Sequence, residues 1–250
     1  RFTSLLFYIS SLFSLKKTSL IIQVEDIPGA RKISFNLLDK ISFKILSLFA
    51  KHIFFAGEGM LNQFIEKNPN YSNVSLYPPS LTKEFVKIIK KRRAPFQDKF
   101  INIMYAGGHT NEKGIFDLIN VFQVLKNKKY ILNIYGYFPE KIKKNYLKNK
   151  SIIFHGFVSK KELITSYSKC DIVVNPHKLI MNNNYIFPYK NIEIFASRAF
   201  PIVSDFSICG FESLGISNLC KYENTNELKL LVEKAPLIWR KNSKKFEDSS

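Results

Sequence analysis

Lys190 and Glu193 stand three residues apart at the start of a predicted helix, and together they suit a ligand that carries both phosphate and sugar hydroxyls. A helix start leaves backbone N–H groups unpaired and carries the positive end of the helix dipole, so it attracts anions. Lys190 adds a full positive charge in the first turn. The carboxylate of Glu193, about one turn further on, offers two acceptors for hydroxyl groups. We therefore predict that this helix start binds a phosphate beside a sugar.

The residues around this pair predict a loop, a helix and a buried strand in immediate succession. Phe187 precedes the helix, Pro188 suits its first turn because the missing N–H would be unpaired there, and Tyr189 follows. Apolar residues then recur at helical spacing. Pro201 closes the helix, and a short apolar run ends in a loop at Asp205, as expected of an inner parallel strand.

A second group of such residues follows a predicted strand over 100–106. Gly107 and Gly108 would let the backbone approach a ligand closely or adopt positive φ, and His109 comes next. Lys113 stands at the start of the helix predicted for 115–125. Glycines and a lysine after a strand are a moderately specific sign of an anion site.

Three further predicted strands also end in candidate binding residues. The aromatic side chains at these strand ends could stack on a nucleobase, and the histidine could lie near phosphates. Burial under the next helix, or a place in an ordinary loop, would explain their presence equally well. These residues are Gly136, Tyr137, Phe157, Val158 and His177.

Strands alternate with helices from position 100 to about 235, which predicts a doubly wound parallel sheet. Ligands of such sheets bind beyond the carboxyl ends of the strands. All the segments named above fall on that one edge, and this convergence is stronger than any single motif.

Composition describes an ordinary globular chain, with 250 residues, 46% hydrophobic and 23% charged. The net charge of +18 has two readings, a lysine-rich composition without functional meaning or attraction to anionic partners. Cys170, Cys209 and Cys220 show no paired spacing, which favours a reducing, cytoplasmic compartment. No metal-ligand motif is visible, so we expect no metal and no cofactor.

The front of the chain predicts a second α/β domain. A strand over 19–24 delivers Glu25 and Asp26 to a loop, where they would orient a ligand or simply cap the next helix. The basic amphipathic helix of 33–50 would lie on an anionic membrane or pack on a sheet, and we favour packing. With a linker near 94–97, the predicted organisation is one domain over 1–95, a second domain over 96–240 that holds the predicted ligand crevice, and a frayed polar tail over 241–250.

The stretch Phe-Pro-Tyr-Lys-Asn-Ile-Glu-Ile-Phe-Ala-Ser-Arg-Ala-Phe-Pro-Ile-Val-Ser-Asp, residues 187–205, resembles the donor-binding motif of GT-B glycosyltransferases, in particular the retaining family 4 (group 1). The resemblance implies two Rossmann-like domains, the first truncated at its N-terminus. It also implies that the helix start and Lys113 hold the diphosphate of a nucleotide-sugar, and that Glu193 holds the ribose. The loop at Phe157 and Val158 would read the base through its backbone, and Glu25 or Asp26 would face the acceptor.

The resulting expectation is a metal-independent, retaining transfer of a sugar to a glycan or lipid-linked acceptor, in cell-envelope polysaccharide synthesis. Lys113 and Lys190 would stabilise the leaving group in place of a metal. We expect peripheral contact with the inner face of an anionic membrane and no specific nucleic acid. Alternatives are a nucleotide-sugar 2-epimerase, a non-catalytic basic module that binds nucleic acid or membranes, and a donor-binding half without activity.

Overall fold

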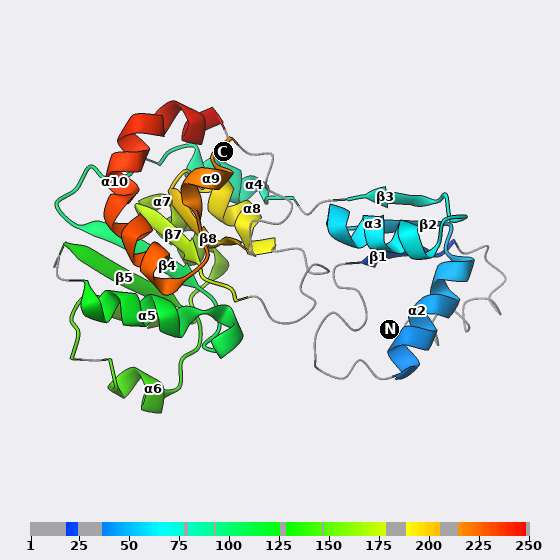
Figure 1. Cartoon of the computed structure of the whole chain (residues 1–250), viewed down its shortest axis with the longest axis horizontal. Coiled ribbons are helices and arrows are strands. Elements are labelled where there is room, and N and C mark those ends of the chain that lie inside the picture. The colour runs from blue at the N-terminus through cyan, green and yellow to red at the C-terminus, as the bar shows by residue number, and fades with distance from the viewer. Residues whose placement is uncertain are drawn as a thin grey trace. The chain divides into compact units, whose positions relative to one another are not determined.

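The structure, a computed structural model, describes residues 19–24, 37–77, 80–92, 94–125, 129–146, 148–178, 189–205 and 215–248. The contacts group these residues into two units: the described residues up to position 77 form the N-terminal unit, and those from position 80 onward form the C-terminal unit (Figure 1). Each unit is an α/β structure built on a parallel sheet, as the sequence predicts.

The N-terminal unit holds a three-stranded parallel sheet in the order β1-β2-β3. Ile53 and Phe55 on its middle strand are fully buried, and Phe64 and Leu46 from the two helices also enter the core. The elements are β1 (Ile21–Val24), α2 (Leu37–Phe49), β2 (His52–Phe55), α3 (Glu58–Lys67) and β3 (Val74–Leu76).

The C-terminal unit holds a six-stranded parallel sheet in the order β6-β5-β4-β7-β8-β9. The chain builds outward from β4 in one direction, then returns to the other side of β4 with β7, so the strand order reverses between these two strands. A ligand crevice is expected at such a reversal. The strands are β4 (Ile101–Ala106), β5 (Tyr130–Tyr135), β6 (Ile152–Gly156), β7 (Ile172–Asn175), β8 (Phe200–Ser204) and β9 (Lys221–Tyr222).

Helices cover both faces of this sheet, which confirms the doubly wound fold class. Residues of α5 and α10 pack in the cluster that contains Ile103 and Leu132, whereas residues of α4, α7 and α8 pack in the cluster that contains Met104. Alternate residues of β4 therefore enter opposite clusters, as the two-residue strand period requires. The helices are α4 (Lys83–Ile89), the 3-10 turn η1 (Asn111–Lys113), α5 (Ile115–Val124), α6 (Glu140–Lys144), α7 (Lys160–Lys169), α8 (Tyr189–Ala196), α9 (Ser217–Cys220) and α10 (Thr225–Asp248).

A capping box opens α7. The hydroxyl of Ser159 accepts a hydrogen bond from the N–H of Glu162 (3.2 Å), and the carboxylate of Glu162 accepts one from the N–H of Ser159 (2.9 Å). These two bonds lower the pKa of Glu162. The helix therefore begins where the sequence signal places it, directly after the loop at Phe157 and Val158.

The division between the units falls near position 79, not at 95/96 as the linker-like sequence suggests. Phe85 and Ile89 of α4 are buried in the core of the C-terminal unit. Further along, the carboxylate of Asp171 accepts hydrogen bonds from the N–H groups of Phe96 (2.7 Å) and Asn102 (2.8 Å). The segment that reads as a linker is thus fastened to the sheet.

The expectation of a frayed tail over 241–250 is wrong for the described residues up to 248. Helix α10 continues to Asp248, with a non-helical residue at Asn242 inside it. Phe246 is buried, and its ring lies 5.0 Å from that of Trp239 and 5.2 Å from that of Phe200 (centroid to centroid). Phe246, an aromatic residue within a basic stretch, therefore packs the last turns of α10 against the core.

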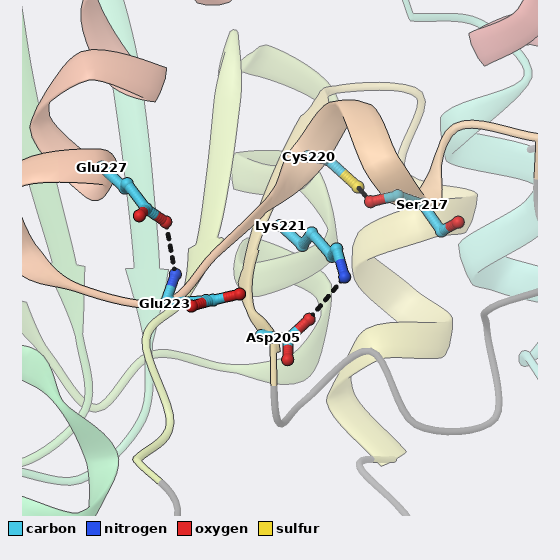
Figure 2. Close-up of polar contacts among 6 residues, drawn as sticks. All are labelled: Asp205, Ser217, Cys220, Lys221, Glu223 and Glu227. Carbon is cyan, nitrogen blue, oxygen red and sulfur yellow. Dashed lines mark hydrogen bonds and ion pairs between the residues drawn. The ribbon is translucent and has the colours of Figure 1, made fainter.

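The elements α9 and β9 were not predicted, and polar contacts tie β9 and the residue after it to their neighbours (Figure 2). Lys221 on β9 forms an ion pair with Asp205, the residue after β8 (2.7 Å). The N–H of Glu223 donates to the carboxylate of Glu227 in the first turn of α10 (2.9 Å). Strand β9 pairs with β8 and is the last strand at this edge of the sheet.

No described helix is both long and apolar enough to cross a membrane.

Candidate functional site

A cavity of about 520 Å³ lies beyond the carboxyl ends of β4, β5 and β6. It brings together eight residues that the sequence analysis proposed from separate segments. These are Gly107, Gly108, His109, Gly136, Tyr137, Phe157, Val158 and Lys190. The other described residues lining it are Ala106, Thr110, Tyr135, Gly156 and Leu163.

Glycines shape the floor of this cavity. Gly136 has a φ of 122° and Gly156 has a φ of 71°, values that residues with a Cβ rarely adopt. A Cβ on Gly136 would also collide with the carbonyl oxygen of Gly107. The N–H of Gly136 donates to the carbonyl of Gly156 (2.8 Å), and the N–H of Gly107 donates to that of Tyr135 (2.9 Å). The loops that follow the three strands are therefore fastened to one another.

Lys190 reaches the cavity from the first turn of α8 and hydrogen-bonds the carbonyl of Ala106 at the end of β4. Burial lowers the pKa of Lys190 from 10.5 to about 8; the charge of Glu193 acts to raise it, and that of Lys113 to lower it further. The ammonium is thus held partly desolvated beside the carboxylate and a second cation. An anionic ligand would compensate for this cost.

Glu193 lies one turn after Lys190, and a buried phenol holds its carboxylate. The hydroxyl of Tyr167 on α7 donates to Oε2 of Glu193 (3.3 Å). Burial and the charge of Glu193 raise the pKa of Tyr167, so the phenol stays a neutral donor. Within the described part of the chain, Oε1 of Glu193 makes no hydrogen bond, so it can accept one from a ligand.

Sequence reasoning missed Tyr167. The apolar spacing of its helix assigns it to the core, and it is indeed 1% exposed, with its ring 5.8 Å from that of Phe85. The direction of its hydroxyl depends on how α7 and α8 pack together, which the sequence pattern does not show.

Lys113 ends the turn η1, directly before α5, close to its predicted place. Gly114 follows with φ of 65°, and a Cβ there would collide with the carbonyl of Pro176 in the loop after β7. In that same loop Lys178 forms an ion pair with Asp117 of α5 (2.8 Å). The loops after β4 and β7 are therefore packed together, and the charge of Lys113 acts on Lys190.

Aromatic rings form the rim of the cavity at the ends of β5 and β6. Tyr137 and Phe157 each follow a glycine with positive φ, and their rings lie 6.3 Å apart at 16°. Phe157 is 83% exposed, an unusual state for a phenylalanine. The ring of His109 meets that of Tyr137 edge-on at 5.7 Å. These rings thus form a flat apolar surface at the mouth of the cavity.

Four predicted residues are described but do not line this cavity: Lys113, Glu193, His177 and Tyr189. The carbonyl of His177, in the loop after β7, accepts a hydrogen bond from Ser204 (2.5 Å). Tyr189 begins α8 and is largely buried. Four further candidates, Glu25, Asp26, Phe187 and Pro188, lie outside the described residues.

Among the described residues, no three His, Cys, Asp or Glu side chains gather as metal ligands would.

A doubly wound parallel sheet with a basic, glycine-lined cavity at its strand ends defines an α/β domain of the nucleotide-binding class. The chain belongs to the family Glycosyl transferases group 1, whose pattern matches residues 86–236. The resemblance noted in the sequence is thereby confirmed. No curated protein matches the sequence.

Solved structures with the same fold are GT-B glycosyltransferases. HepE of Anabaena in complex with UDP superimposes with a TM-score of 0.71 at 12% identity, over 98% of this chain and 69% of that one. Sucrose-phosphate synthase from Thermosynechococcus elongatus gives 0.65 at 13% identity, over 97% and 66%. The lipopolysaccharide outer core galactosyltransferase WaaB, in its apo form, gives 0.59 at 14% identity, over 94% and 64%. The chain therefore spans about two thirds of the length of these proteins.

Proposed function

We propose that this chain transfers a sugar from a nucleoside diphosphate-sugar to a glycan or lipid-linked acceptor. The observation that carries the proposal is the position of Lys190, which lines the cavity of the glycine loops and feels the charges of Lys113 and Glu193. Family membership supports sugar transfer, and the structural neighbour HepE has been solved with UDP and with UDP-glucose. A uridine nucleotide is therefore the first donor to test.

The cavity suggests how the donor would be held. The diphosphate would lie against the loop of Gly107 and Gly108, between the ammonium groups of Lys190 and Lys113. The ribose hydroxyls would hydrogen-bond the carboxylate of Glu193, and the base would lie near the backbone of Phe157. In this arrangement the diphosphate lies nearest the start of α8, and the base lies nearest the rim of the cavity at Phe157.

We propose that transfer proceeds without a metal and with retention at the anomeric carbon. The bond between the anomeric carbon and the β-phosphate oxygen breaks, and its electron pair goes to the departing diphosphate. The oxygen of the acceptor hydroxyl bonds to the anomeric carbon from the same face, and its proton passes to the departing diphosphate. Two lysines would stabilise that charge inside a partly desolvated site, where an ion pair counts for more than in water. Glu25 and Asp26 remain the candidates for orienting the acceptor hydroxyl.

A screen of UDP-, GDP- and ADP-sugars by thermal shift tests donor binding. A ligand at 100-fold excess over its Kd should stabilise the native state by about 2.7 kcal/mol. Glu193→Ala should abolish or strongly reduce this shift while the protein stays folded. If no nucleotide-sugar stabilises the wild type, or if the variant responds like the wild type, the proposal fails.

Helix α2 offers a separate surface for peripheral contact with an anionic membrane, which we propose as the location of the acceptor. Ile41, Leu48 and Phe49 are exposed on the side of α2 that also carries Lys44. Apolar side chains beside a lysine suit the boundary between lipid headgroups and chains. Co-sedimentation with vesicles containing phosphatidylglycerol should fall for Leu48→Ser together with Phe49→Ser; equal sedimentation of this variant would refute the contact.

A further inference from the structure

A second cavity, of about 400 Å³, lies on the C-terminal unit against β4 and β5 and beside α7. It shares one residue, Tyr135, with the nucleotide cavity. The function proposed above uses none of its other residues. We call it the amide groove; it is lined by Asp98, Asn102, Met104, Asn133, Tyr135, Ser166, Lys169 and Cys170.

Two asparagine amides form the floor of the amide groove, one from each strand. The amide oxygen of Asn133 lies 2.9 Å from Nε2 of His155. Its amide nitrogen lies 3.5 Å from the carbonyl oxygen of Ile103, which is the longest distance that still counts as a hydrogen bond. Within the part of the chain that the structure describes, the side-chain amide of Asn102 makes no hydrogen bond. Both amides therefore keep donor capacity for a ligand.

The walls of the groove add hydroxyl groups and balanced charge. The hydroxyls of Tyr135 and Ser166 are hydrogen-bonded to one another, and that of Ser166 donates to the carbonyl of Glu162 (2.9 Å). Asp98 and Lys169 contribute one negative and one positive charge. A phosphate or another strong anion would meet the carboxylate of Asp98, so the groove does not favour it. A purely apolar ligand would leave the amides unsatisfied, which costs free energy.

One aromatic ring that lines the groove, that of Tyr135, belongs to a stacked pair between β5 and β6. The rings of Tyr135 and His155 are parallel, 4.4 Å apart at 4°, and Tyr137 and Phe157 form a second stacked pair one step further along the same two strands. Burial lowers the pKa of His155 below its usual 6.5, so this imidazole is neutral at pH 7. Neutral aromatic faces beside amide donors match a ligand with apolar C–H faces and many hydroxyl groups.

We propose that the amide groove is a second carbohydrate site, which binds a neutral saccharide chain next to the nucleotide cavity. Its volume falls in the range of about 300–1,000 Å³ usual for small-ligand sites. Single-stranded nucleic acid would also stack on aromatic rings, but it requires a positively charged groove along its backbone. Charges of opposite sign at Asp98 and Lys169 favour the saccharide.

The test is binding of the fluorescently labelled full chain to an array of defined neutral oligosaccharides, followed by calorimetry with the tightest one. Asn102→Ala and Asn133→Ala should each weaken binding at least tenfold. Asn145→Ala removes an exposed asparagine amide at the end of α6 and should leave binding unchanged. Thermal unfolding of each variant without ligand shows whether it is folded, and Asn102→Ala keeps the test valid if Asn133→Ala does not fold.

Loss of saccharide binding in folded groove variants, with wild-type binding by Asn145→Ala, supports the proposal. Three outcomes would overturn it: no oligosaccharide bound by the wild type, equal binding by the groove variants, or displacement of the saccharide by poly(U). Because UDP is absent from this assay, its result is independent of whether the nucleotide cavity binds a donor.

Discussion

Replacing Lys190 by methionine tests whether the cavity holds a partly desolvated cation. Lowering the pKa of Lys190 from 10.5 to about 8 means that the charged form is disfavoured by about 3 kcal/mol relative to an exposed lysine. Between pH 8 and pH 10.5 the unfolded chain binds more protons at this residue than the native protein. Native stability therefore rises with pH through this window, as the buried ammonium loses its proton.

Lys190→Met has no group to titrate, so the difference between the two proteins isolates this effect. The stability of the wild type relative to the variant should rise by about 2 kcal/mol between pH 7 and pH 9.5, and by about 3 kcal/mol once titration is complete. Urea unfolding followed by fluorescence of Trp239, the single tryptophan, reports on the C-terminal unit. Lys161→Met, at an exposed lysine of α7, should show no pH-dependent difference from the wild type.

The same lysine should make nucleotide binding depend on pH. The charged ammonium is the form that binds a diphosphate, so the affinity of the wild type for UDP should fall as pH rises above 8. Lys190→Met should bind UDP weakly, with little change over that range. A stability difference that stays constant from pH 7 to pH 9.5 would refute the idea of a desolvated cation at this position.

Three further substitutions, with Gly108→Ala as a control, test the packing of the C-terminal unit. Tyr167→Phe removes the hydrogen bond to Glu193 and should weaken the binding of UDP about tenfold, and that of 2′-deoxy-UDP less. Calorimetry with both nucleotides measures the difference, and an equal loss of affinity for both would contradict a role of this bond at the ribose. Gly136→Ala should destabilise the protein by more than about 1 kcal/mol in urea unfolding. Gly108→Ala should not, because its Cβ would meet no atom within 4 Å. A similar loss of unfolding free energy in the two variants would be inconsistent with the observed backbone. Phe246→Ala should cost about 3–5 kcal/mol in the same assay, and a loss under 1 kcal/mol would mean that the end of α10 contributes little to the core.

Much of the C-terminal unit follows from local pattern. Alternating strand and helix signals specify a parallel sheet, and a parallel sheet places every strand-end loop on one edge. For this reason Gly107, Gly136, Phe157 and Lys190 could be assigned to one site without knowledge of their contacts. Family resemblance then gave Glu193 its role at the ribose, which stays a prediction.

Other features depend on tertiary packing and could not be predicted. The apolar residues of α4 fit either unit equally well, so the boundary near 79 was not visible. Phe246 stands in a basic stretch whose composition suggests solvent, yet one aromatic ring finds space beside Trp239. Likewise, the bond from Tyr167 to Glu193 depends on the relative rotation of two helices.

A crystal structure of the protein with UDP tests the central claim most directly. The account predicts that the diphosphate lies between the ammonium groups of Lys190 and Lys113, with a ribose hydroxyl within hydrogen-bond distance of Glu193 and the uracil beside Phe157. Nucleotide bound on another surface, or bound in this cavity with its ribose away from Glu193, would contradict the account.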